Sequence, residues 1–368
     1  MMNRKSFACS VMFCLLGVLT RSAASAATAP VGQVELTVAA PTQSRGDASG
    51  AMHVVVWYPA ADGITTSPLA IGPPGTPLFE EGAAARDAAV APAPQRFPLL
   101  VISHGAGGMG ANYGWLGTAL AAQGYVVAAV DHPGNHAVDP QTVQGMTLWW
   151  LRASDVSRAI DAVLADRRFT GRIDRGRIGA IGHSLGGYTM LEVAGARSDL
   201  LAFLAYCAGH AEEQVCTGEA SNARGLGMQA RALQTSDPAY AAELARSGDS
   251  YRDPRVRAVL VLAPALAPAL TQESLHAITV PVEIIDGLSD AVTPLADNAA
   301  PLTRAIPGAQ LHVLDAPVGH YSFLDQCTAA GQDRLPVPCN DSGPIRASAH
   351  VATVALAEAF FAATLGAP

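Results

Sequence analysis

The stretch Arg177–Tyr188, with the sequence RIGAIGHSLGGY, decides the fold of this chain. It begins as a short apolar segment typical of a buried strand and ends as a helix start, with a sharp turn between them. Within it, Gly182–Gly186 (GHSLG) matches G-x-S-x-G, in which a serine at a strained strand-to-helix turn projects its hydroxyl above the sheet. Glycines two residues before and after Ser184 leave the room that such a turn needs. The stretch therefore predicts a nucleophilic serine at the carboxyl end of a buried strand.

Strand-like and helix-like segments alternate on both sides of this stretch. The predicted strands are 33–38, 53–58, 97–103, 125–130, 177–183, 256–262, 280–285 and 311–314. The predicted helices are 111–123, 147–168, 185–197, 295–305 and 346–365. Such alternation predicts an α/β fold with a mainly parallel, eight-stranded sheet covered by helices on both faces.

Two segments interrupt this alternation. Residues 60–96 are rich in Ala, Pro and Gly and have no periodicity, which predicts a long irregular excursion. Residues 199–254 contain a helical piece near 228–246, and we interpret them as an inserted cap that covers the site. The remainder is expected to form one α/β domain over 27–368.

Residues 1–26 have the pattern of a secretory signal peptide. Arg4 and Lys5 form a charged start, Phe7–Thr20 is an apolar core, and Ala24–Ala26 offers a small-residue cleavage site. The apolar core is too short to span a membrane comfortably, although a short anchor helix is the alternative. We therefore expect a periplasmic or secreted protein with no stable membrane insertion after cleavage.

The composition excludes several classes of protein. The formal net charge is −8 and basic runs are absent from the sequence, which argues against nucleic acid as a partner. Lys5 is the only lysine, so Schiff-base chemistry, a Walker-type phosphate lysine and serine hydrolases with a lysine base are excluded. The oligomeric state cannot be predicted from these features.

Four cysteines follow the predicted signal peptide, and in an exported protein they predict two disulfides. Of the three possible pairings we favour the one between nearest neighbours, Cys207 with Cys216 and Cys327 with Cys339. Free buried thiols are the alternative. The spacings fit no zinc-ligand pattern, and no metal or other cofactor is expected.

A serine nucleophile needs a general base, which an acid in turn orients. Five histidines follow Ser184: His210, His276, His312, His320 and His350. His320 is the favoured base because it follows the last strand on a Gly-preceded loop, at the sheet edge where the serine projects. His312 lies within a strand and His350 on the closing helix, so both are expected to be structural.

Asp290 is the favoured acid. Asp286 and Asp290 both follow the strand 280–285, but Asp290 lies further into the loop, before Thr293-Pro294, and can reach across. Asp286, at the strand end, is expected to stabilise the turn. Asp315 is a weaker third candidate.

The Gly-rich segment His104–Gly108 follows an inner strand. Its backbone N–H groups can point at a developing oxyanion, together with the N–H of Leu185. A tight turn without a catalytic role is the alternative. The residues expected to line the substrate pocket are His104, Gly105, His132 and His183.

The residues of this region also match two other kinds of site. Gly105–Gly110 (GAGGMG) also matches G-x-G-x-x-G, with Asp131 at the end of the next strand, as in a dinucleotide-binding fingerprint. We disfavour it because the motif sits in the third strand unit and an exported protein has little access to NAD. Asp131, His132, His136 and Asp139 could indicate a metal site, but the proline and glycine between the histidines favour a turn.

At these residues the chain resembles the α/β-hydrolase superfamily, and the best match is to dienelactone-hydrolase-like and platelet-activating-factor-acetylhydrolase-like serine esterases. The matching pieces are Ser103–Gly108, Asp131–Gly134, Gly182–Gly187, Asp290 with Pro294, and Gly319-His320. The resemblance implies an α/β-hydrolase fold and an ester hydrolase with an acyl-enzyme on Ser184. It also implies that Ala106 and Leu185 are the oxyanion donors.

The chain departs from both namesakes. Dienelactone hydrolases have a cysteine in place of Ser184, and the acetylhydrolases have their acid where this chain has Ala263–Ala265. The acid is therefore expected at Asp290, and the substrates of these two families cannot be assigned to this chain. Asp290–Pro294 (DAVTP) also resembles the acid loop of secreted polyester hydrolases, so the ester could be a small molecule or a polymer. An amide or peptide hydrolase, and a non-catalytic binding protein on this scaffold, remain alternatives.

Overall fold

The computed structural model describes residues 29–39, 45, 50–92, 95–212, 216, 223–341 and 343–368. The predicted signal peptide, 1–26, lies outside the described residues. The strands are β1 (Val31–Ala39), β2 (Ala51–Pro59), β3 (Ser67–Ile71), β4 (Phe79–Arg86), β5 (Phe97–Ser103), β6 (Val126–Val130), β7 (Ile173–His183), β8 (Val256–Leu262), β9 (Val282–Gly287), β10 (Gln310–Leu314) and β11 (Gln326–Cys327).

The α-helices are α1 (Gly114–Ala122), α2 (Val143–Thr147), α3 (Leu151–Ala165), α4 (Leu185–Ala194), α5 (Leu200–Gly209), α7 (Ala223–Ser236), α8 (Pro238–Leu244), α9 (Gln272–His276), α10 (Ala299–Ala305), α11 (Ala329–Arg334) and α12 (Gly343–Leu365). The described residues also form the 3-10 turns η1 (Gly110–Tyr113), η2 (Ala267–Ala269) and η3 (His320–Phe323).

The central sheet has the strand order β10-β9-β8-β7-β5-β6-β2-β1. Strands β5 to β10 pair in parallel, whereas β2 runs antiparallel to β6 and β1 antiparallel to β2. The predicted eight-stranded, mainly parallel sheet is therefore confirmed. Parallel strands bring their carboxyl ends to one edge, where the loops after β5, β7, β9 and β10 meet.

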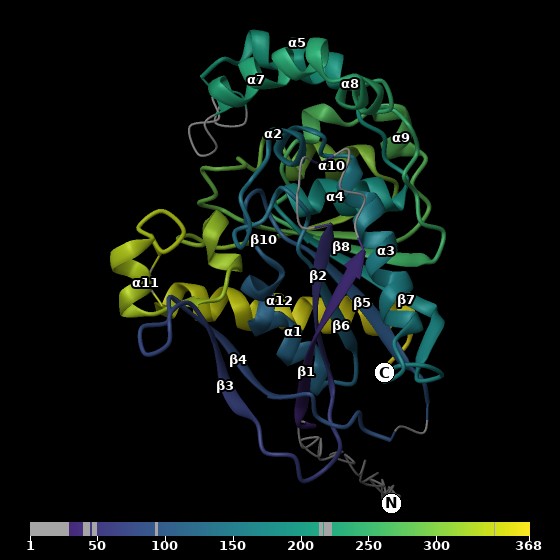
Figure 1. Cartoon of the computed structure of the whole chain (residues 1–368), viewed down its shortest axis with the longest axis vertical. Coiled ribbons are helices and arrows are strands. Elements are labelled where there is room, and N and C mark those ends of the chain that lie inside the picture. Colours follow the sequence, from purple (N-terminus) through teal and green to yellow (C-terminus); the bar gives the residue numbers. More distant parts are fainter. Residues whose placement is uncertain are drawn as a thin grey trace, which may run out of the picture.

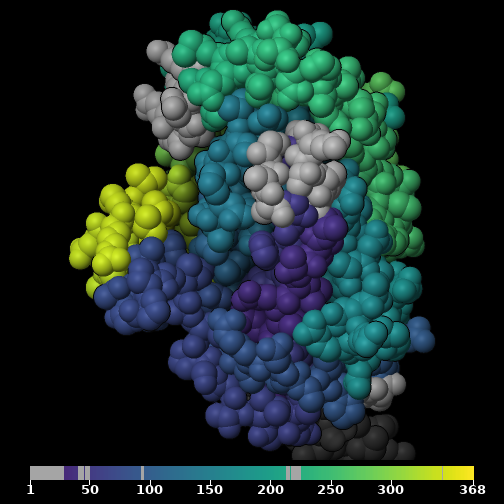
Figure 2. Space-filling view, in the orientation of Figure 1, coloured from purple at the N-terminus to yellow at the C-terminus, as the bar shows by residue number. Residues whose placement is uncertain are grey.

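The prediction of an irregular excursion over 60–96 is wrong, because this segment contains β3 and β4. Strand β4 pairs with β1, with β3 and with β11, and extends the sheet to eleven strands. Figure 2 shows this blue segment against the yellow C-terminal segment. The sequence of β4, FEEGAAAR, has no clear alternation, so only its distant pairing partners make it a strand.

Helices cover both faces of the sheet, as predicted. Alternate residues of β5 point to opposite sides: Leu99 and Val101 join one core cluster, and Leu100 and Ile102 join the other. Helices α3, α4 and α10 supply side chains to the first cluster, and α1 and α12 supply the second. Figure 1 shows α12 crossing the sheet.

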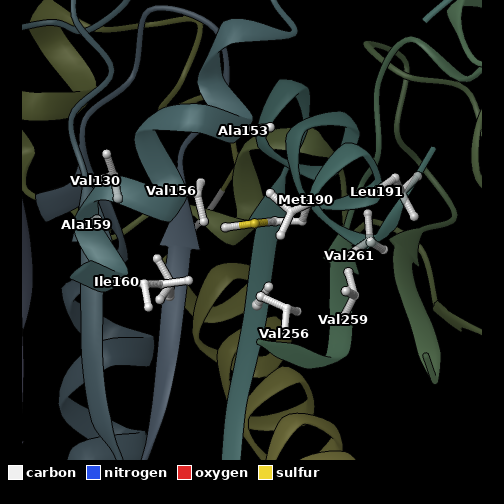
Figure 3. Close-up of a cluster of buried hydrophobic side chains, with 14 of the residues drawn as sticks. Val130, Ala153, Val156, Ala159, Ile160, Met190, Leu191, Val256, Val259 and Val261 are labelled. Carbon is white, nitrogen blue, oxygen red and sulfur yellow. The ribbon is translucent and has the colours of Figure 1, made fainter. Parts of the chain in front are cut away.

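The first cluster includes the part of the core that supports the elbow. Figure 3 shows Val156 and Ile160 of α3, Met190 of α4, and Val259 and Val261 of β8, which belong to one cluster and are all fully buried. Because each buried aliphatic side chain contributes about 1.5–3 kcal/mol, this packing fixes α3 and α4 firmly on the sheet.

Helix α12 is the one helix in the described part of the chain that is long and apolar enough to cross a membrane. Its Phe360 and Phe361 are buried in the second core cluster against the sheet. A core helix of a soluble protein has the same length and composition, so α12 is accounted for by this packing.

The segment between α4 and β8 carries α5, α7 and α8, which lie together at the top of the view in Figure 1. The helical piece expected near 228–246 is confirmed as α7 and α8. The hydroxyl of Tyr240 in α8 lies 2.9 Å from that of Thr147 in α2, which joins this segment to the body. The predicted disulfides are both present, with S–S distances of 2.04 Å for Cys207–Cys216 and 1.99 Å for Cys327–Cys339.

Candidate active site

Ser184 stands between the end of β7 and the start of α4, with φ 56° and ψ −122°. This backbone conformation is strained for a residue with a Cβ, and it is typical of a nucleophile elbow. A Cβ on Gly182 would collide with the carbonyl oxygen of Gly186, and one on Gly186 with that of Ser103. Gly182 therefore allows the elbow to close tightly on itself, and Gly186 allows it to approach the end of β5.

His320 and Asp290 form a buried pair, with 2.7 Å between Nδ1 of the imidazole and Oδ2 of the carboxylate. Asp290 also accepts hydrogen bonds from the backbone N–H groups of Val292 and Thr293 and from the Thr293 hydroxyl. Burial opposes ionisation, but His320 and these donors outweigh it and hold the pKa of Asp290 below its usual value. An ionised carboxylate only accepts, so Nδ1 carries the proton and Nε2 is free to act as a base.

The competing candidates lie elsewhere. Asp286 is fully buried at the end of β9, where its Oδ1 accepts from the N–H of Gly287 at 2.8 Å. Burial, followed by the charge of Asp290, raises the pKa of Asp286 to about 8. His312 lies 3.4 Å from Glu283 on the neighbouring strand, and the ring of His276 bonds to the carbonyl of Ala305. His210 lies in the cap segment and His350 on α12. Asp315 lies in the turn after β10.

The loop after β5 lies directly against Ser184. A Cβ on Gly105 would stand 3.1 Å from Cβ of Ser184 and 3.6 Å from its Oγ. The N–H groups of Gly105, Gly107 and Gly108 bond to the Tyr113 hydroxyl, Asn135 Oδ1 and the Gly105 carbonyl, respectively. Within the described residues, no hydrogen bond engages the N–H of Ala106. The N–H of Leu185 is the first of α4, where helical donors have no partner within the helix.

Beneath this loop lies a buried polar network that the sequence pattern did not predict. Oγ of Ser103 lies 2.8 Å from Nε2 of His132, whose Nδ1 lies 2.9 Å from Asp155. Arg45 binds the other oxygen of that carboxylate at 2.9 Å. The three residues Ser103, His132 and Asp155 have the connectivity of a catalytic triad. They are fully buried, however, so no substrate can reach them.

Arg152 links this network to the loop. Its guanidinium is fully buried and bonds to Oγ of Ser103, the carbonyl of His104, Oδ1 of Asn135 and Oγ1 of Thr189. The expectation that His104 and His132 line the substrate pocket is wrong, because neither has any exposed surface. The ring nitrogens of both histidines make hydrogen bonds within the protein, and these bonds support the loop after β5.

The sequence also predicts His183 in the pocket, but the residue is only 2% exposed and its ring joins two loops instead. Its Nε2 lies 3.1 Å from the carbonyl of His320, and its Nδ1 lies 2.8 Å from the Tyr113 hydroxyl. Burial, followed by the charge of His320, lowers the pKa of His183 to about 3, so its ring is neutral at pH 7. Nε2 must donate to the carbonyl; Nδ1 therefore accepts from Tyr113, whose oxygen accepts from Gly105. This chain of bonds connects the loop after β5 to the segment that carries His320.

We predict that Tyr113→Phe destabilises the protein by about 1–3 kcal/mol, because the N–H of Gly105 and Nδ1 of His183 then stay buried without a partner. Urea unfolding followed by tryptophan fluorescence measures the change. Tyr125→Phe is the matched control, since the buried Tyr125 hydroxyl has no hydrogen-bond partner among the residues that the structure describes. Equal losses in the two variants would contradict the bridging role of Tyr113.

A cleft of about 240 Å³ borders His320. Its lining residues are Ser289, Ala291, Val292, Pro317, Gly319, His320, Tyr321, Ser322, Asn340, Asp341 and Ile345. The loops after β9 and β10 and the segment after the Cys327–Cys339 disulfide thus form its walls.

Neither rival interpretation finds support in the geometry. The carboxylate of Asp131 accepts the N–H of Gly110 at 2.6 Å, so it is engaged within the Gly-rich loop itself. His132 pairs with Asp155, and His136 lies 3.6 Å from Asp139. In the part of the chain that the structure describes, no group of three His, Cys, Asp or Glu residues could hold a metal ion.

The sheet order, the helices on both faces and the elbow define an α/β-hydrolase fold. Residues 94–317 match the family described as "Serine aminopeptidase, S33", and the chain belongs to that family. The predicted membership of the α/β-hydrolase superfamily is confirmed.

Several characterised proteins are similar over part of the chain. A bis(hydroxyethyl) terephthalate hydrolase of Streptomyces coelicolor is 36% identical over 29% of this chain and 31% of its own length. Cutinase est1 of Thermobifida alba is 33% identical over 29% of this chain and 33% of its own. A platelet-activating factor acetylhydrolase of Cavia porcellus is 25% identical over 27% of this chain and 32% of its own. The chain thus spans about a third of the length of these relatives.

A solved structure extends the likeness of fold to almost the whole chain. The ferulic acid esterase from Streptomyces cinnamoneus superposes with a TM-score of 0.59 over 94% of this chain and 92% of its own, at 23% sequence identity.

Proposed function

We propose that the chain is an exported serine hydrolase that cleaves carboxylic esters through an acyl-enzyme on Ser184. The observation that carries the proposal is the 2.7 Å pair of His320 and Asp290 on the loops beside the strained Ser184 elbow. Nε2 of His320 takes the proton of the serine hydroxyl as the oxygen attacks the ester carbonyl. It then returns that proton to the leaving alcohol, and water releases the acid in a second, equivalent round.

The developing oxyanion is received by the N–H groups of Ala106 and Leu185. Two observations support this assignment. The N–H of Ala106 has no hydrogen bond within the described residues, and the N–H of Leu185 lies at the start of α4. Removal of one such donor typically costs two to three orders of magnitude in turnover. Gly105, against Ser184, would form the floor of the substrate site.

The names of the relatives favour an ester as substrate, either small or polymeric, because they include a terephthalate ester hydrolase and cutinases. The family description names an aminopeptidase, so an amide or peptide hydrolase with the same three residues is the second candidate. The cap formed by α5, α7 and α8 is proposed to cover the site.

A fluorophosphonate probe and a substrate panel test this proposal. We expect the probe to label Ser184, and p-nitrophenyl esters of rising chain length to be turned over much faster than matched p-nitroanilides. Anilide hydrolysis at an equal rate would favour the amide hydrolase. Absence of labelling would favour a non-catalytic binding protein.

We predict that the exported protein begins near Ala27, because the signal pattern over 1–26 ends in Ala24–Ala26. The two disulfides are consistent with an oxidising compartment. N-terminal sequencing of material from the periplasm or medium measures the start. As a control, Leu16→Arg interrupts the apolar core and should leave the protein in the cytoplasm. Exported protein that retains Met1 would contradict the prediction.

A further inference from the structure

Three consecutive carbonyl oxygens just after His320 are each held by a different side chain. The oxygen of Phe323 accepts from Nε1 of Trp115 at 3.1 Å. That of Leu324 bonds to Nε2 of His350 at 2.8 Å, and that of Asp325 accepts from Nη1 of Arg346 at 2.7 Å. We name Trp115, Arg346 and His350 the carbonyl clamp.

The clamp is itself fixed by contacts between its members and with its surroundings. The rings of Trp115 and His350 stack with centroids 3.8 Å apart and an interplanar angle of 4°. The backbone N–H of Trp115 also donates to Oδ1 of Asp325 at 2.9 Å, so α1 makes two hydrogen bonds to the segment. Arg346 forms an ion pair with Asp341, which lines the cleft beside His320. All three members are at most 8% exposed.

The segment that carries His320 needs such external support. It consists of a single 3-10 turn, η3, between the loop after β10 and the two-residue strand β11. A 3-10 turn has poor hydrogen-bond geometry and little stability of its own. Side chains from α1 and α12, two helices packed on the sheet, therefore determine where the turn lies.

We propose that the carbonyl clamp positions the His320 imidazole for proton transfer, so that Trp115, Arg346 and His350 are positioning residues of the reaction. This inference rests on the proposed function, in which His320 is the base. Displacement of a reacting group by about 1 Å can reduce a rate a hundredfold, so a loosened segment is expected to slow turnover. Binding of the ester should change little, because no clamp residue lines the cleft.

Two substitutions at His350 separate the hydrogen bond from the volume of the ring. His350→Leu fills much of the space but cannot donate to the Leu324 carbonyl, whereas His350→Gln keeps an N–H donor. We expect His350→Leu to lower kcat for a p-nitrophenyl ester about ten- to a hundredfold with KM nearly unchanged, and His350→Gln to recover most of the loss. Equal kcat in wild type and His350→Leu would overturn the proposal.

Phe361→Leu is the control for a general loss of stability. Phe361 is fully buried on the same helix, eleven residues further on, and its ring lies against that of Tyr125. It makes no hydrogen bond to the carbonyl groups that the clamp holds. The substitution should lower the melting temperature without lowering kcat at a temperature where the protein is folded. A fall in kcat that follows melting temperature equally in Phe361→Leu and His350→Leu would overturn the clamp.

A measurement without substrate distinguishes failure of the clamp from failure of the proposed function. The proton between His320 Nδ1 and Asp290 should give a downfield NMR signal in wild type and in His350→Gln, and this signal should be broadened or lost in His350→Leu. If wild type hydrolyses no ester but the signal depends on His350 in this way, the proposed function fails and the positioning by the clamp stands. An unchanged signal in His350→Leu would overturn the clamp.

Discussion

Ser184→Ala is expected to abolish ester hydrolysis, with a fall in kcat of about a million-fold, while the fold is retained. The reason is that the substitution removes the hydroxyl at the strained elbow, and a triad serine typically contributes this much to turnover. Turnover of a p-nitrophenyl ester and near-UV circular dichroism measure the two parts of the prediction.

Ser103 provides an internal comparison for this experiment. It too is hydrogen-bonded to a histidine, but it has no exposed surface, so a fluorophosphonate probe should leave it unlabelled in wild type and in Ser184→Ala. Residual turnover above a few per cent in a pure preparation, or labelling of Ser103, would show that the nucleophile is wrongly assigned.

Asp290→Asn should lower kcat by about four orders of magnitude, whereas Asp286→Asn should have a small effect. An amide at position 290 would donate to Nδ1 of His320 and so favour the wrong tautomer of the ring. Asp286 does not contact that ring, and with a pKa of about 8 its carboxyl is mostly protonated at pH 7. Asparagine resembles a protonated aspartic acid, so its introduction there changes little.

The ratio of the two kcat values is the decisive measurement. Both aspartate side chains are fully buried and both are replaced by asparagine, so the two variants differ only in the position of the change. Circular dichroism of each variant checks that the fold is intact. If Asp286→Asn proves the more damaging of the two, the acid must be moved to the end of β9.

The parts of the fold that follow from local pattern could be predicted from the sequence. Buried strands such as β5 and β7 are continuous apolar runs, and the G-x-S-x-G turn joins β7 to α4 in the structure as expected. The pairing of Asp290 with His320 could also be anticipated, because carboxyl ends of parallel strands meet at one edge.

Features that depend on convergence of distant side chains could not be predicted. Asp155 lies on α3 and His132 after β6, and no spacing in the chain signals that they meet at Ser103. For the same reason the sequence favours a place in the pocket for His183, although Tyr113 and His320 engage both of its ring nitrogens in the structure. Strand β4 was not predicted because pairing, and not its own composition, defines it.

The pairing of β11 with β4 has a consequence for the order in which the molecule is assembled. Gln326 lies opposite Glu80, so the strand that follows the base segment must find a partner made long before it during synthesis. Closure of so long a loop carries an entropic cost, and such distant pairings form slowly. Because chains emerge and fold from the N-terminus, we expect hydrolytic competence to be among the last properties acquired. A partly synthesised chain would then have the elbow in place but would not yet hydrolyse esters.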